Sequence, residues 1–173
     1  HGGTFGVFVA LWYFSRKNPE FPTLWLFDRI SIPVPMVAGF IRLGNLMNSE
    51  IIGKPTDLPW SLVFERVDQI PRHPAQLYES FIYFLLFGLN LLFYRKNPRP
   101  AHGIIFGFGM IWIFGWRMVF ELVKETQEPF EAGMFMNMGQ LLSIPFVLLG
   151  VFLIVRAWRS RDRLPSGNRV VGA

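Results

Sequence analysis

The sequence predicts an all-α integral membrane protein in which about five transmembrane helices form a single membrane domain, residues 1–173. Hydrophobic residues fill 51% of the chain, and aromatic residues fill 17%. Charged residues contribute only 17%, against about 25% in a typical soluble protein. The sequence also contains long stretches without a charged residue. The longest is the 24-residue stretch Ala132–Val155, which as a helix would cross about 30 Å of hydrocarbon.

The first two membrane segments are expected near residues 1–14 and 24–47. Residues 2–14 carry no charge, but the run is short for a complete span. The second segment is a weaker candidate, because three charged residues and two prolines interrupt it. Proline removes a backbone donor and disfavours continued helix, so this segment is the most irregular of the five.

An outer loop is expected over residues 51–75, between the second and third segments. It contains the turn-forming runs 53–57 and 58–60, and residues 61–65 can form a short strand. The third segment is expected near residues 76–94, where residues 80–94 are uncharged and almost wholly apolar. We therefore expect one small extracytoplasmic region between two membrane helices.

The last two segments are expected near residues 103–123 and 133–156. Only Arg117 and Glu121 interrupt the first of these, and no charge interrupts the second before Arg156. Residues 157–173 then form a basic tail. The length of both runs favours membrane helices over helices in a soluble core.

The basic residues indicate how these segments are oriented. They cluster after the first, third and fifth segments, at Arg16, Lys17, Arg95, Lys96, Arg99, Arg156 and Arg159. Cytoplasmic connections of membrane proteins carry such an excess, so the five segments alternate without conflict and the C-terminus is cytoplasmic. The net charge of +5 is then spread over rims that face anionic lipid, which argues against a nucleic-acid partner.

Composition also limits the chemistry that the chain can supply. It has no Cys, which excludes a thiolate nucleophile or a zinc-thiolate site from its own residues. Its three His are far apart and lack the spacing of metal ligands. We therefore predict neither a metal nor a cofactor.

Charged side chains inside membrane segments are costly and usually face the protein interior. Arg117 and Glu121 lie four residues apart and share a helix face. One interpretation is an internal ion pair that neutralises both residues. The other is that Arg117 binds an anion and Glu121 orients the arginine.

A second polar group follows at Arg42, Asn45 and Ser49, whose spacing predicts one stripe along a helix. Arginine, amide and hydroxyl groups suit the oxygens of a phosphate. Glycines at 44 and 53 would permit close approach of a ligand or a backbone. The alternative is an interfacial helix end with Arg42 reaching toward lipid headgroups.

Histidines mark two further places. His1 precedes a small-residue track that favours close helix packing, and such a histidine is either a hydrogen-bonded core residue or a catalyst. His73, Gln76 and Tyr78 belong to a polar run at the start of the third segment. That run is either an interfacial belt or part of a binding site.

Five of these pieces, in this order, resemble the bacterial prolipoprotein diacylglyceryl transferases. The motif RLGNLMNSEIIG at residues 42–53 is similar to the family signature, with Ile41 and Leu46 replacing its Gly and Phe. The other four pieces are HGG at 1–3, RHPAQLYE at 72–79, Arg117 with Glu121, and MGQ at 138–140. The family carries a basic residue before Pro-Asp after the Arg/Glu helix. Residues 124–129 depart from this, so Lys124 receives no role.

The resemblance implies a multi-pass enzyme of the bacterial cytoplasmic membrane. Such an enzyme moves the diacylglyceryl group of phosphatidylglycerol to the lipobox cysteine of a prolipoprotein, forming a thioether and releasing glycerol phosphate. The partners expected are therefore phosphatidylglycerol, the prolipoprotein signal peptide and membrane lipid. The reactive thiol arrives on the substrate, so a Cys-free enzyme is consistent with this chemistry.

The resemblance also assigns roles. Arg42 and Arg117 are expected to hold the phosphate, and His1 is the expected base for the thiol. His73 and Glu121 are weaker candidates for that base. The substrate-binding set is Arg42, Asn45, Glu50, Gly53, His73, Gln76, Tyr78, Arg117 and Glu121.

Family members also have an N-terminal arm and further membrane helices before the His1 motif, and we expect this chain to lack them. The chain alone is then expected to be inactive. The alternative function is a multi-pass transporter or structural subunit with a buried Arg–Glu pair, which the family motif disfavours.

Overall fold

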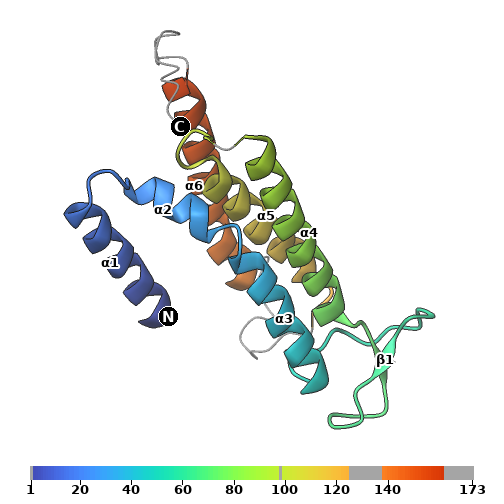
Figure 1. Cartoon of the computed structure of the whole chain (residues 1–173). Coiled ribbons are helices and arrows are strands. Elements are labelled where there is room, and N and C mark those ends of the chain that lie inside the picture. The colour runs from blue at the N-terminus through green and yellow to red at the C-terminus, as the bar shows by residue number, and fades with distance from the viewer. Residues whose placement is uncertain (1, 98, 125–137, 162–173) are drawn as a thin grey trace.

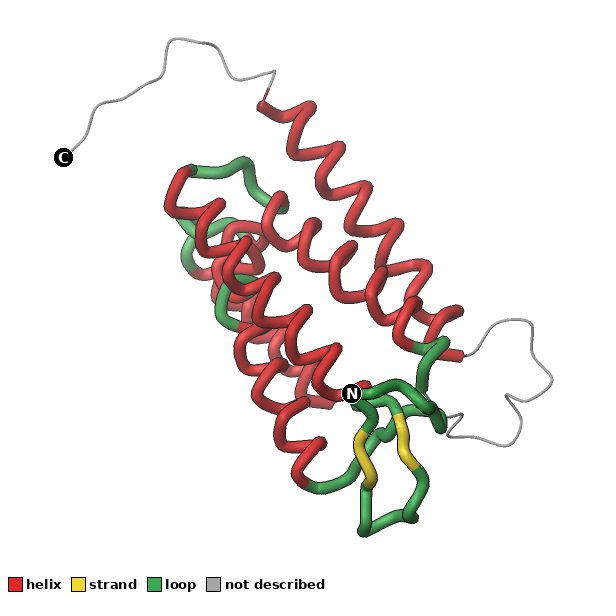
Figure 2. The backbone as a smooth tube through the Cα atoms, turned by 90° about the vertical axis from the view of Figure 1, so that its right-hand side faces the viewer, coloured by secondary structure: helices red, strands yellow, loops and turns green. Residues whose placement is uncertain are grey.

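The computed structural model describes residues 2–97, 99–124 and 138–161. The described part is mostly helical (Figure 1). The helices are α1 (Gly2–Lys17), α2 (Thr23–Ile30), α3 (Val34–Met47), α4 (Ala75–Lys96), α5 (Ile104–Phe120) and α6 (Met138–Arg161). Strands β1 (Leu62–Val63) and β2 (Pro71–Arg72) form the antiparallel pair that Figure 2 shows at one end of the helices. This confirms a mostly helical chain with a small two-stranded sheet between the second and third predicted segments. We call residues 54–73 the strand region.

Two of the described helices, α4 and α6, are long and apolar enough to cross a membrane. A third span is possible if α2 and α3 are taken together, since they follow one another at a bend of 41°. Helix α5 is apolar but shorter, at 17 residues. The structure therefore supports two to three candidate spans, and the expected count of about five is not confirmed.

The break between α2 and α3 falls within the second predicted segment. Pro33 and Pro35 lie at the start of α3, where a helix tolerates residues that lack a backbone donor. Their rings prevent a continuous ladder from α2, so one expected helix becomes two. At the other end of the chain, α6 continues to Arg161, five residues beyond the expected end of the fifth segment at 156. The expected start of that segment at 133 lies outside the described residues.

Close backbone approach joins the helices in pairs. A Cβ atom on Gly107 of α5 would lie 2.9 Å from Gly150 O of α6, and one on Gly150 would lie 2.7 Å from Gly107 O. Helices α3 and α4 pack similarly, with Gly39 against the ring of Phe84 and Ser80 Oγ donating to Gly39 O at 3.1 Å. Such glycine contacts are typical of helices that pack within lipid.

Polar contacts join the remaining helices. Asp28 of α2 is 2% exposed and accepts hydrogen bonds from the backbone N–H groups of Gly103 (2.7 Å) and Phe106 (2.8 Å). It thereby satisfies donors at the start of α5 that have no partner within the helix. Asn90 Nδ2 of α4 donates to Ser31 O at 3.0 Å. These contacts connect α2 to both α4 and α5.

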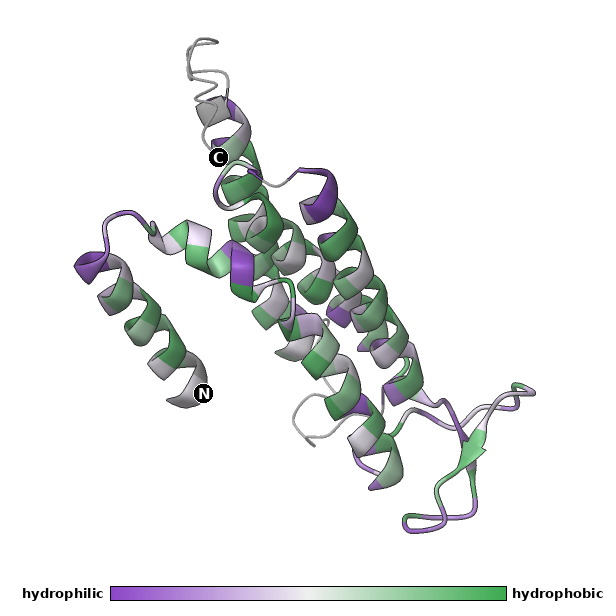
Figure 3. Cartoon of the chain, viewed as in Figure 1, coloured by the Kyte–Doolittle hydropathy of each residue, from purple (hydrophilic) through white to green (hydrophobic). Residues whose placement is uncertain are grey.

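The outward faces are apolar. Phe81 of α4, Phe152 of α6 and Trp158 of α6 have exposed fractions of 66%, 61% and 65%. In Figure 3 hydrophobic residues run along the helices, and hydrophilic ones gather mainly at the helix ends and in the strand region. Large exposed apolar surfaces are unusual in water but expected in a bilayer, so the arrangement indicates a membrane location.

Candidate active site

Three segments that are distant in sequence meet at one end of the helices (Figure 1). They are the C-terminal half of α3, the first turns of α4 and the residues that follow α5. Helix α3 contributes Arg42 and Asn45, α4 contributes Gln76 and Glu79, and the chain after α5 contributes Lys124. Three of the sequence-predicted polar residues, Arg42, Asn45 and Gln76, therefore lie in one region.

A buried carboxylate lies at the centre of this region. Glu79 Oε2 lies 2.8 Å from Arg42 Nε, and Glu79 Oε1 lies 2.5 Å from Lys124 Nζ. The Glu79 side chain is 3% exposed, and those of Lys124 and Arg42 are 11% and 21% exposed. We call these three residues the ion cluster. Because one carboxylate contacts two cations, the three groups together carry one surplus positive charge.

Asn45 extends the ion cluster toward Glu50. In the amide orientation that satisfies its partners, Asn45 Oδ1 accepts from Arg42 Nη1 and Asn45 Nδ2 donates to Glu50 Oε2, both at 3.2 Å. Arg42 and Asn45 lie three residues apart on α3, so their side chains point to one side of the helix. Ser49 does not continue this stripe. Helix α3 ends at Met47, and Ser49 has a left-handed φ of 58°, so that part of the expectation is wrong.

Gln76 contacts the segment that follows α3. Its Nε2 donates to Glu50 O at 2.6 Å. Its Oε1 is buried and has no hydrogen-bond partner among the described residues. An acceptor without a partner in a buried position is costly, which favours a ligand donor at this place.

Gly53 and Lys54 attach the strand region to the end of α5. Gly53 pairs with Lys124 as an isolated bridge, Lys54 N donates to Val123 O at 2.9 Å, and Lys54 Nζ donates to Leu122 O at 2.9 Å. On the other side, Arg72 Nη1 donates to Gly53 O at 3.3 Å. Residues 53–54 therefore hold both the backbone of Lys124 and the segment that leads into α4.

Arg72 and Asp68 form a second ion pair within the strand region. Arg72 Nη2 lies 2.6 Å from Asp68 Oδ2, and Arg72 is 6% exposed. The hydrogen bond from this guanidinium lowers the pKa of the Asp68 carboxyl below its ordinary value of 3.8, and a backbone N–H from Ile70 acts in the same direction. The pair fixes the turn from which β2 leads into α4.

His73 follows β2 and Tyr78 lies in the first turn of α4, and both contact the strand region or α5 rather than the ion cluster. Trp60 Nε1 donates to Tyr78 Oη at 2.8 Å, and His73 Nδ1 lies 3.4 Å from the same oxygen. The Tyr78 ring stacks on Phe120 at the end of α5. These contacts give both residues a role in holding the strand region against α5.

Arg117 and Glu121 do not pair with each other among the described ion pairs. The carboxylate of Glu121 lies against Gly139 of α6, where an added Cβ atom would be 2.7 Å from Oε2. Arg117 is exposed in the described structure. The internal ion pair is therefore not seen among the described residues, and binding of an anion by Arg117 stays a prediction.

Sequence reasoning missed three residues of this region. Glu79 belongs to the motif at residues 72–79, but its position there indicated no role for it. Lys124 was likewise given no role. Tyr83, one turn after Glu79, has its hydroxyl beside Arg42 and within electrostatic reach of Glu79 and Arg117. The available signal was the acidic Glu79 in an otherwise apolar helix. His1 lies outside the described residues.

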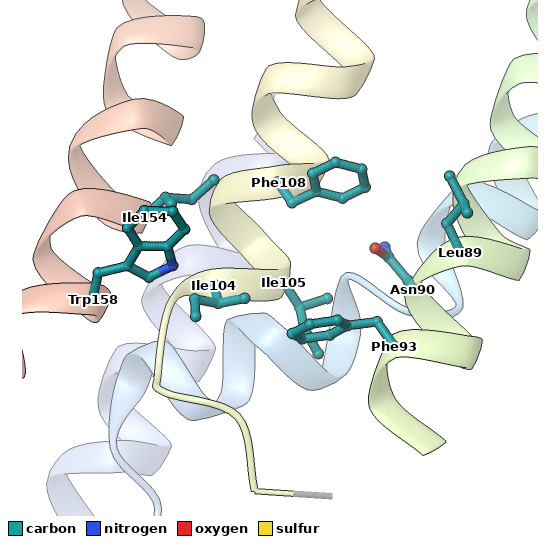
Figure 4. A pocket seen from close by; sticks show the side chains of 8 residues that line it. All are labelled: Leu89, Asn90, Phe93, Ile104, Ile105, Phe108, Ile154 and Trp158. Atoms are coloured by element: carbon teal, nitrogen blue, oxygen red, sulfur yellow. The ribbon is translucent and has the colours of Figure 1, made fainter. Parts of the chain in front are cut away.

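A separate cavity of about 380 Å³ lies between α4, α5 and α6, and no residue of the ion cluster lines it (Figure 4). Seven of its eight lining residues are apolar, and the amide of the eighth, Asn90, is engaged with Ser31. This cavity suits hydrocarbon rather than a phosphate. Among the described residues, no cluster of three His, Asp or Glu side chains is suited to a metal ion.

The fold and the site together define a helical membrane protein in which two cationic side chains and one buried carboxylate cluster where the strand region meets the helices. Residues 1–156 match the model of the Prolipoprotein diacylglyceryl transferase family. The chain therefore belongs to this family, which confirms the resemblance seen in the motifs.

Relatives named phosphatidylglycerol–prolipoprotein diacylglyceryl transferase support the same assignment. The chain is 46% identical to that of Tolumonas auensis over 94% of its own length and 63% of the relative. It is 48% identical to that of Bacteroides fragilis over 89% of its length and 56% of the relative. For Chloroherpeton thalassium the identity is 45%, over 91% of this chain and 59% of the relative. The chain thus spans about 56–63% of the length of these relatives.

Proposed function

We propose that this chain is part of an enzyme of the bacterial cytoplasmic membrane that transfers the diacylglyceryl group of phosphatidylglycerol to the lipobox cysteine of a prolipoprotein. The observation that carries the proposal is the ion cluster, in which the cations Arg42 and Lys124 share one buried carboxylate. Tyr83 lies next to Arg42 and within electrostatic reach of Arg117. The names of the relatives supply the substrates. The strand region then faces outward and the C-terminus faces the cytoplasm.

The reaction balances as a single displacement. The cysteine sulfur of the prolipoprotein forms a bond to the diacylglycerol carbon that carries the phosphate. The bond between this carbon and the phosphate oxygen breaks, and its electron pair leaves with glycerol phosphate. The thiol proton passes to a base, for which His1 is our candidate by resemblance, with His73 and Glu121 as alternatives.

The residues of the site contribute by stabilising the leaving group. Negative charge grows on the phosphate oxygens as the ester bond breaks, and fixed cations in a site of low dielectric stabilise that charge strongly. Arg42 is held by Glu79 and Asn45, so its guanidinium is oriented before substrate binds. Arg117 is the second cation proposed for the same anion, and its exposed side chain supports that role.

The headgroup of phosphatidylglycerol also carries hydroxyl donors. The unpartnered Gln76 Oε1 is an acceptor for one of them, next to the Glu50 backbone. Asn45, Glu50 and Gly53 hold the segment around this acceptor. Such an acceptor would favour a headgroup with a free hydroxyl over one that lacks it.

The test is transfer of labelled phosphatidylglycerol to a lipobox peptide by the full-length purified protein, followed by the mass of the peptide. Arg42→Ala and Arg117→Ala should each reduce transfer by about 100-fold or more. Arg66→Ala, which removes an exposed arginine of the strand region, is the matched control and should retain transfer. No transfer by the unmodified protein would favour the alternative of a transporter or structural subunit.

A further inference from the structure

The ion cluster carries more positive than negative charges. Arg42 and Lys124 supply two positive charges and Glu79 supplies one negative charge, so the sum is +1. Glu50 reaches the cluster only through Asn45, and its side chain is exposed. Glu121 lies against Gly139 instead. Among the residues that the structure describes, Glu79 is therefore the carboxylate that directly limits the charge of the two cations.

The two phosphates of the proposed reaction differ in charge. Phosphatidylglycerol is a phosphodiester and carries one negative charge at neutral pH. Glycerol phosphate is a phosphomonoester, and such groups carry about 1.5 to 2 negative charges at pH 7 because their second pKa is near 6. An added positive charge therefore attracts the product about twice as strongly as the substrate.

We propose that Glu79 is a positioning residue that holds Arg42 and Lys124 in one site and limits its positive charge, so that the site binds the phosphodiester yet releases the phosphomonoester. This inference rests on the proposed function and makes Lys124 a further cation of the site. The burial of Glu79 supports it, since an interaction within a site of low dielectric is screened less by water than one at the surface.

The location of Lys124 supports the same inference. Its backbone is held by the bridge to Gly53, and its ammonium group contacts Glu79 with 11% of the side chain exposed. A cation at an exposed helix end already interacts favourably with the helix dipole, so that role alone does not require contact with a buried carboxylate. The side chain is instead directed toward the carboxylate that also holds Arg42.

The experiment is a charge series in the full-length protein, with two readouts for each variant: KM for phosphatidylglycerol and the inhibition constant for glycerol phosphate. Glu79→Gln raises the charge of the cluster to +2, Lys124→Met lowers it to zero, and the double variant returns it to +1. Glu79→Asp keeps the charge. Lys96→Met is the matched control, because Lys96 is exposed at the far end of α4.

Inhibition should follow the charge. Glu79→Gln should lower the inhibition constant about tenfold, with a smaller decrease in KM, as expected for one extra charge near a partly buried anion. Lys124→Met should raise both constants. The double variant and Glu79→Asp should return the inhibition constant to within about twofold of the unmodified protein.

A purely structural role for Glu79 predicts a different pattern. Glu79→Gln would then lose activity without tighter inhibition, and removing Lys124 as well would not restore the inhibition constant; either result would overturn the proposal. If Glu79→Gln does not fold, the double variant and Lys124→Met still test it, because they differ by one charge.

Direct binding of glycerol phosphate by calorimetry separates the two proposals. If the unmodified protein shows no transfer, the proposed function fails. Affinities that nevertheless rise from Lys124→Met to the unmodified protein to Glu79→Gln would support the role of Glu79. Affinities that do not depend on the charge of the cluster would overturn it.

Discussion

A side chain at position 53 would collide with the backbone that leads into α4. A Cβ atom on Gly53 would lie 2.5 Å from His73 O and 2.6 Å from His73 Cβ. These separations are far below van der Waals contact, so the backbone would have to move. The glycine is therefore explained by close approach between two chain segments, whether or not it also contacts a ligand.

Gly53→Ala should loosen the strand region by about 1–3 kcal/mol, the usual cost of inserting a methyl group into a tight contact. The measurement is hydrogen exchange of the backbone over residues 54–73. Gly44→Ala is the control, because no atom lies within 4 Å of a Cβ at Gly44 and alanine favours a helix. Equal exchange in both variants would contradict this explanation.

The Asp68–Arg72 pair makes the strand region sensitive to acid. Because the folded state lowers the pKa of Asp68 below 3.8, the pair stabilises the fold above that value. Stability is lost as the pH falls through the lower folded pKa, where the carboxylate is protonated. Proteolysis of residues 54–73 should therefore accelerate as the pH falls below the ordinary aspartate pKa of about 4. The Asp68→Asn variant should be cleaved faster at neutral pH, and its cleavage should depend much less on pH.

At the scale of elements, the helices α5 and α6 depend on a reciprocal glycine contact. Each glycine faces the backbone oxygen of the other, with separations below 3 Å for an added Cβ atom. There is no room for any side chain at this crossing. The contact brings the two helix axes close, and this places Gly139 of α6 next to the carboxylate of Glu121.

Gly107→Ala and Gly88→Ala should therefore have opposite effects. Gly88 lies within α4 with no atom within 4 Å, so alanine should stabilise the protein by about 0.5–1 kcal/mol. At Gly107 the same methyl group meets Gly150 O, and the overpacking should destabilise it by about 1–3 kcal/mol. Thermal unfolding in one detergent compares them. A gain in stability at both positions would rule out the tight crossing.

The pattern of apolar runs predicted most elements but not their breaks. The uncharged runs located α4 and α6 because their length far exceeds that of ordinary apolar stretches. The prediction over residues 24–47 merged α2 and α3, since the two prolines were treated as interruptions rather than as a helix start. The difference depends on contacts such as that of Asn90 with Ser31, which hold the bend and are not visible in a local pattern.

The candidate site was predicted in part for a similar reason. Arg42 and Asn45 form a pattern within one helix, so their spacing was sufficient to group them. Glu79 and Lys124 are 45 residues apart, and only the fold shows that they share an ion pair. The roles assigned to Arg117, Glu121 and His1 stay predictions.

At the scale of the whole molecule, the absence of cysteine provides a direct test of orientation. Asp57→Cys and Lys96→Cys would each introduce one thiol at an exposed position, at opposite ends of the helices. With the strand region outside, a maleimide that cannot cross membranes should label Asp57→Cys in intact cells. It should label Lys96→Cys only after the membrane is opened. The reverse pattern would invert the proposed topology.

The span of the ion cluster along the chain also has a consequence for biosynthesis. Arg42 is made 37 residues before Glu79, and Lys124 is made 45 residues after it. At about 5–20 residues per second, the ribosome needs roughly 2–7 s to supply the carboxylate that neutralises Arg42. During that interval the translocon or a lipid headgroup has to accommodate the arginine. The two cations can share Glu79 only after α5 has been translated, so the ion cluster forms late in biosynthesis.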